Sequence, residues 1–113
     1  MEFDISPLMK DFEGNEVVFT EEGSEELKKL SYKKCLLNFC GSAMPQETIS
    51  GEEKILRFKL GLKIADCTDK VDLTLDEVKK LKDLSRLYGS TLTAGRIAQL
   101  LEPAEFEAKK EKS

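Results

Sequence analysis

Residues 50–64 read "SGEEKILRFKLGLKI" and decide how the rest of the chain is interpreted. Two interpretations compete for this stretch. From Arg57 to Ile64, apolar residues alternate with charged residues or glycine, which is typical of a half-buried β-strand. Ser50 and Glu53, however, have the S-x-x-E spacing of a helix capping box, in which each side chain satisfies a backbone N–H of the first turn.

The helical interpretation accounts for more of the apolar residues than the strand does. A helix forms one stripe from Ile55, Phe58, Leu62 and Ala65 and a second row from Leu56, Leu60 and Ile64. We therefore predict a helix over 51–65 and expect it to be the central, most buried helix, with Phe58 in the core. Gly61 lowers helix stability by about 1 kcal/mol relative to alanine. A glycine at this position predicts close approach by another element.

Three further helices follow from capping residues, apolar spacing and stop signals. They are predicted at 32–41, 75–88 and 92–102, the second of them with a capping box formed by Thr74 and Glu77. Upstream, the sequence predicts a β-hairpin or a pair of short strands at 2–6 and 10–19, with a turn at Gly14 and Asn15, followed by a polar linker over 20–29. Residues 70–73 are predicted to be extended. The expected fold is α+β, mostly α, with the N-terminal hairpin packed on a bundle of about four helices.

The length and composition predict a single soluble domain. A chain of 113 residues fits one globular domain, which we place at 1–102, followed by a charged C-terminal tail at 103–113. No apolar run is long enough to cross a bilayer, and the first residues lack the basic and apolar regions of a secretory signal. The three cysteines, an odd number, favour a reducing compartment over a disulfide framework. We therefore expect a cytoplasmic protein.

Charge is distributed unevenly along the chain. Residues 1–27 contain nine acidic residues and one lysine, whereas residues 28–64 contain eight basic and three acidic residues. The two segments either neutralise each other within the fold or present a charged binding surface, and the sequence leaves both open. For the second case, the candidate partner-binding residues are Glu13, Glu16, Glu21, Glu22, Glu25 and Glu26.

No residue pattern in the chain indicates catalysis or metal binding. The absence of histidine excludes Ser-His and Cys-His catalysis and histidine metal sites. Cys35 and Cys40 lie five residues apart and Cys67 stands alone, so we interpret all three as small apolar filler. The carboxylates of Asp66, Asp69, Asp72 and Asp76 do not match the spacing of a calcium-binding loop. We predict a protein that is not an enzyme and has no cofactor, metal or disulfide.

One segment raises the alternative of DNA binding. Residues 74–102 have the order helix, glycine-containing turn, helix, and Arg96 and Gln99 lie on the second helix as base-reading residues do. That helix offers one cation and the chain is acidic, whereas specific DNA binding needs several phosphate contacts from lysine and arginine. Two packed antiparallel helices give the same pattern. The sequence therefore favours a protein partner over a nucleic acid.

Several motifs in order resemble a group of short proteins encoded by bacteriophages and prophages. They are "KDFEGNEV", "SGEEKILRFKLGLKI", "VDLTLDEVKKLKDL" and a final helix of small residues ending in "LLE", and they cover residues 10–102 in separate pieces. The cysteine-bearing "YKKCLLNFCGS" has no counterpart in that group. The resemblance implies a non-enzymatic accessory protein in a bacterial host cytoplasm and supplies no catalytic residues.

The expected function is protein–protein contact that modulates or inhibits a host or defence protein, with the acidic residues as the candidate contact face. The alternatives are DNA binding through residues 74–102 and a role as a virion-assembly or chaperone-like factor. No membrane association is expected, and the sequence leaves a homo-oligomer open.

Overall fold

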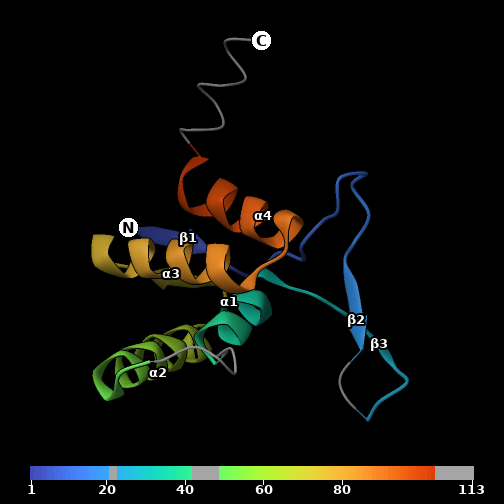
Figure 1. Cartoon of the computed structure of the whole chain (residues 1–113). Coiled ribbons are helices and arrows are strands. Elements are labelled where there is room, and N and C mark those ends of the chain that lie inside the picture. Colours follow the sequence, from blue (N-terminus) through green and yellow to red (C-terminus); the bar gives the residue numbers. More distant parts are fainter. Residues whose placement is uncertain (21–22, 42–48, 104–113) are drawn as a thin grey trace.

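Helices dominate the computed structural model of the chain, which describes residues 1–20, 23–41 and 49–103 (Figure 1). The helices are α1 (Tyr32–Cys40), α2 (Gly51–Asp66), α3 (Leu75–Tyr88) and α4 (Thr91–Leu101). The strands are β1 (Glu2–Asp4), β2 (Val18–Thr20), β3 (Leu27–Lys29) and β4 (Lys70–Asp72). The predicted α+β, mostly α fold is confirmed, and each helix begins and ends within one residue of its predicted bounds. All of the predicted C-terminal tail except Pro103 lies outside the described residues.

Each helix begins at a hydroxyl side chain that accepts a hydrogen bond from the backbone of the first turn. At Thr74 the predicted capping box is complete, because the Glu77 carboxylate also accepts a hydrogen bond from the Thr74 N–H at 2.9 Å. At the start of α2 only half of the predicted box forms. Ser50 Oγ accepts from the Glu53 N–H, but the Glu53 carboxylate binds charged side chains instead. Charge-assisted hydrogen bonds are stronger than those from a neutral backbone N–H.

The strands pair differently from the predicted hairpin between 2–6 and 10–19. β1 runs antiparallel to β4, with Phe3 opposite Val71, which is fully buried. The hairpin forms later in the chain, between β2 and β3, and it includes part of the segment 20–29 that we predicted to be a linker. Every residue of β3 is exposed, so this strand has no apolar alternation from which it could be predicted.

The turn predicted at Gly14 and Asn15 is present in the first loop. Gly14 has a φ of 86°, in the left-handed region that glycine adopts without steric cost. Lys10 and Glu16 pair antiparallel on either side of this turn. Beyond it, β2 and β3 extend to one side of the helices (Figure 1).

The hydrophobic core lies around α1 and α3. Helix α1 contacts both α2 and α3, and α3 contacts both α1 and α4, so α2 and α4 lie at opposite ends of the group (Figure 1). The faces predicted for the two central helices are buried: Cys35, Leu36, Phe39 and Cys40 from α1, and Val78, Leu81 and Leu84 from α3. The paired strands β1 and β4 and the residues next to them also contribute to this core, through Ile5 and Val71.

Helix α2 is not the most buried helix, contrary to the sequence-based prediction. Its only buried residues are Arg57, Leu60 and Ile64. The predicted close approach at Gly61 is confirmed, because a Cβ added there would lie 3.4 Å from the Cβ of Cys40 in α1. Helix α1 packs against α2 at Gly61, and the neighbouring apolar row of Ile55, Phe58 and Leu62 stays exposed beside this contact.

Candidate functional site

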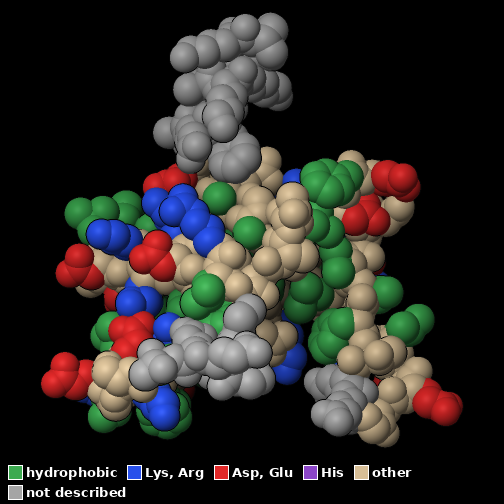
Figure 2. Space-filling model, viewed as in Figure 1, with side chains coloured by type: hydrophobic (Ala, Val, Ile, Leu, Met, Phe, Trp, Pro, Cys, Tyr) green, Lys and Arg blue, Asp and Glu red, His purple; other side chains and the backbone are tan. Residues whose placement is uncertain are grey.

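The outward side of α2 carries a continuous apolar stripe. Ile55, Phe58 and Leu62 are 56%, 65% and 50% exposed, and Ala65 extends the same line. Figure 2 shows hydrophobic side chains at the surface over α2, with acidic and basic side chains beside them. Single exposed apolar residues are normal, but a contiguous apolar patch on an ordered helix marks an interaction site. This stripe, which we call the α2 stripe, is the strongest candidate for a functional surface.

The spacing of the α2 stripe matches helix–helix packing. Its members follow one another at intervals of three, four and three residues. Apolar residues at alternating steps of three and four form the narrow seam along which one helix packs against another in a coiled coil. The stripe covers about two heptads of such a seam. A second helix is therefore the shape that fits it.

Charged residues border the α2 stripe on both edges. Glu52, Lys59 and Asp66 recur every seven residues and so line one edge, while Lys54 lies on the other. All four are exposed, and none forms an ion pair within the described part of the chain. Along the first edge the charges run negative, positive, negative. A partner helix with a positive, negative, positive order would complement this edge.

Ionic contacts hold α2 against α3 and fix the direction in which the stripe faces. The Glu53 carboxylate accepts hydrogen bonds from Arg57 Nε at 3.0 Å and from Lys80 Nζ of α3 at 2.7 Å. The hydrogen bond from Lys80 lowers the pKa of Glu53 most, and the bond from Arg57 lowers it further. Arg57 also donates to the Tyr88 hydroxyl at 2.7 Å, and Lys63 Nζ lies 2.6 Å from Glu77. The stripe is therefore presented by an anchored helix.

A groove runs between α2 and α3 beside the stripe. It has a volume of about 630 Å³, and its lining includes Leu56 and Leu60 together with Lys59, Lys63 and Lys80. Leu56 is 48% exposed, so the groove adds apolar surface next to the α2 stripe. This groove widens the surface that a partner helix can cover.

Of the acidic residues predicted to bind a partner, the structure describes Glu13, Glu16, Glu25 and Glu26. Glu13 is exposed next to the Gly14 turn, and Glu25 and Glu26 are exposed just before β3. Glu16 is half-buried and lies 3.0 Å from Lys29 and 4.0 Å from Lys10. Its pKa is lowered by the hydrogen bond from Lys29. Glu16 is therefore neutralised by lysines of the protein itself. Glu21 and Glu22 lie outside the described residues.

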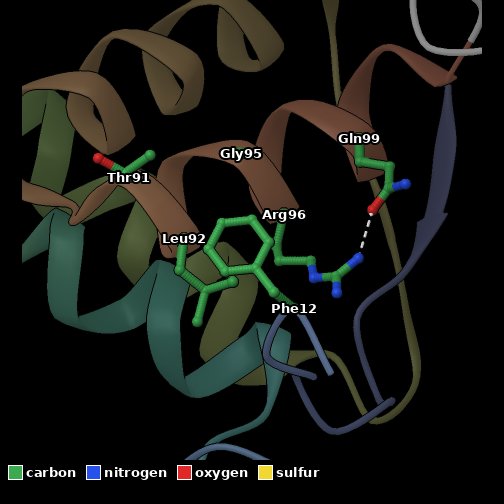
Figure 3. Close-up of a pocket in the computed structure, with 6 residues that line it drawn as sticks. All are labelled: Phe12, Thr91, Leu92, Gly95, Arg96 and Gln99. Atoms are coloured by element: carbon green, nitrogen blue, oxygen red, sulfur yellow. Dashed lines mark hydrogen bonds between the residues drawn. The ribbon is translucent and has the colours of Figure 1, made fainter. Parts of the chain in front are cut away.

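The two residues considered as DNA readers are engaged within the protein. Arg96 donates from Nε to the carbonyl of Lys10 at 2.9 Å and from Nη2 to the carbonyl of Asp11 at 2.7 Å. Its Nη1 donates to Gln99 Oε1 at 3.0 Å (Figure 3). This geometry assigns Arg96 to holding the first loop against α4 and gives no support to base reading.

The cysteines have the surroundings of packing residues. Burial raises the pKa of Cys35 to about 12 and that of Cys40 to about 11, which disfavours reactive thiolates. Cys67 is half-buried and donates to the Lys63 carbonyl at 3.2 Å. All three thiols are free. Within residues 1–20, 23–41 and 49–103, no group of three or more cysteine or carboxylate side chains is placed to hold a metal ion.

Comparison with known proteins adds no relative to this description. The chain matches no protein-family model, no curated protein and no solved structure. The resemblance to phage-encoded proteins thus stays a prediction. Among the described residues, no helix combines the length and apolar character needed to cross a membrane.

Proposed function

We propose that this protein acts by binding another protein, and that the α2 stripe receives one amphipathic helix of the partner. The observation that carries the proposal is the exposure of Phe58, which is 65% accessible in line with Ile55 and Leu62 on an anchored helix. Aromatic residues, phenylalanine among them, are enriched in protein–protein interfaces. An apolar helix face laid along an apolar stripe is a common mode of peptide recognition.

The charges along the edges favour a partner helix over a second copy of this chain. In an antiparallel two-fold pair each edge meets the same edge of the second copy. Lys59 would then face Lys59, and Glu52 would face Asp66, so like charges would oppose one another. A partner helix with an apolar seam, acidic residues at the middle of the edge beside it and basic residues near both ends of that edge avoids this repulsion.

The biological setting of this contact comes from the sequence alone. The resemblance to phage-encoded proteins predicts an accessory protein in a bacterial cytoplasm that modulates or inhibits a host or defence protein. Within that setting the α2 stripe would supply the contact surface, and the exposed Glu13, Glu25 and Glu26 would steer a basic partner towards it. The proposed mode of action needs no catalytic residue.

Binding to designed helical peptides tests this proposal. The first peptide spans two to three heptads with leucine at the seam positions, glutamate at the middle edge positions and lysine near both ends. The control peptide has the same composition with the two charge types exchanged. We expect the full chain to bind the first peptide about tenfold more tightly than the control, measured by fluorescence anisotropy, because each 1.4 kcal/mol changes affinity tenfold. Binding should weaken with added salt.

Matched variants separate binding from folding. Phe58→Ser should reduce affinity for the first peptide at least about tenfold. Leu27→Ser is the control, since Leu27 is 67% exposed on β3, which lies to the side of the helices (Figure 1). Equal binding by the wild-type protein and Phe58→Ser would overturn the proposal. So would a stable wild-type dimer in analytical ultracentrifugation that Phe58→Ser converts to a monomer, because the second copy would then be the occupant.

A further inference from the structure

A second candidate site lies at the other end of the helix group, on α4. A small pocket of about 230 Å³ is lined by Phe12 from the first loop and by Thr91, Leu92, Gly95, Arg96 and Gln99 from α4 (Figure 3). Phe12 is 81% exposed, more than any other large apolar residue of the described chain. The ring stands beside the helix and forms one wall of the pocket. This site does not rest on the function proposed for α2.

Gly95 leaves the floor of the pocket open. It lies inside α4, where glycine is less favourable than alanine. A Cβ added there would meet no atom within 4 Å, so packing inside the protein does not require a glycine. The missing side chain instead allows an external group to approach the helix closely.

Arg96 supplies a fixed positive charge at the rim of the pocket. Its three hydrogen bonds go to neutral acceptors, the carbonyls of Lys10 and Asp11 and the amide of Gln99. A guanidinium group has five N–H donors, so two remain available. The first turn of α4 carries no acidic residue, and Arg96 forms no ion pair in the described part of the chain. A held guanidinium without a carboxylate partner is suited to bind a carboxylate.

We propose that this pocket binds a peptide segment of a partner protein in which an acidic residue lies beside an apolar one. The carboxylate would accept hydrogen bonds from Arg96, and the apolar side chain would pack between Phe12 and the open surface at Gly95. The volume favours a side chain of a larger partner, because pockets for free small molecules span roughly 300–1,000 Å³. A nucleic acid fits less well, since Arg96 is the single cation of α4.

The probe for this site is a short blocked peptide with Leu-Glu-Phe at its centre, and the control replaces its glutamate by glutamine. We expect the full chain to bind the glutamate peptide about tenfold more tightly, with NMR shifts at the Gly95 amide and the Arg96 side chain. Gly95→Leu should abolish binding without lowering the melting temperature, because the added side chain enters open space. Arg96→Gln should remove the preference for glutamate over glutamine.

Four results would overturn the proposal. The first is equal affinity for the two peptides, and the second is unchanged binding by Gly95→Leu. The third is stronger binding of a short DNA duplex that Gly95→Leu removes. The fourth concerns the chain's own "EFE" at 105–107, which has the same chemistry. If the full-length variant Glu105→Gln/Phe106→Ser binds the peptide about tenfold better than the wild type, that segment is the occupant.

Discussion

Helices α2 and α3 have similar sequence signals, but the apolar stripe of α3 is buried and that of α2 is exposed. Both begin at a hydroxyl cap followed by glutamate three residues later, and both carry apolar residues at helical spacing. In α3 the stripe containing Leu81 and Leu84 is buried. In α2 the stripe containing Phe58 and Leu62 faces outward. Helical periodicity identifies a helix, but the arrangement of neighbouring elements decides which of its apolar rows becomes core.

The difference follows from the position of each helix. Helix α3 has α1 on one side and α4 on the other, so its apolar face is enclosed. Helix α2 lies at the edge and packs mainly on α1, with Gly61 allowing the backbone to approach Cys40. Only the row of Leu60 and Ile64 is covered. The remaining apolar row of α2 stays exposed, and it is the surface that we propose binds a partner.

The largest effect should come from the buried stripe of α3. Leu81 is fully buried, so Leu81→Ala should lower the free energy of unfolding by about 2–5 kcal/mol through lost burial and the cavity left behind. Urea denaturation followed by circular dichroism measures this change. A loss below about 0.5 kcal/mol, the range of surface substitutions, would mean that α3 is not the central helix.

An intermediate effect should come from the ionic contacts between the two helices. Glu53→Gln should lower the free energy of unfolding near neutral pH by about 1–3 kcal/mol, because Arg57 and Lys80 lose a charged acceptor. The carboxylate's pKa is below its ordinary value of 4.5 in the folded protein. Its stabilisation is therefore complete above about pH 4.5 and is lost as the pH falls through the folded pKa.

The pH dependence gives this second prediction its own control. Other carboxylates with lowered pKa values, including Glu77 and Asp72, also make the wild type less stable in acid. The difference between the wild type and Glu53→Gln isolates Glu53 and should shrink below about pH 4.5. A difference that stays constant down to pH 3 would show that Glu53 has no ionic role in joining α2 to α3.

The smallest effect should come from the α2 stripe. Phe58→Ala should change the free energy of unfolding by no more than about 0.5 kcal/mol, because the side chain is 65% exposed. The sequence-based expectation of a core aromatic gives about 3–5 kcal/mol instead. Leu75→Ala provides the exposed reference on α3. A loss of about 3 kcal/mol for Phe58→Ala alone would place the α2 stripe inside the fold.

Local signals were sufficient for some of the fold and for little of the candidate site. Caps, helical spacing and stop residues predicted the four helices within one residue, since these depend on neighbours along the chain. The pairing of β1 with β4 joins segments almost seventy residues apart, and no local pattern encodes it. Gly61 was the available signal for the contact between α2 and α1, because its missing side chain leaves room for Cys40.

The sequence by itself determined the helices, the Gly14 turn and the lack of histidine-based chemistry, because each depends on residue type or short-range spacing. Only the tertiary structure decided that the α2 stripe is exposed, that Glu16 is paired and that Arg96 is tied to the first loop. Burial and pairing depend on which elements meet in space. The same kind of apolar row is core beneath a neighbour and exposed surface without one.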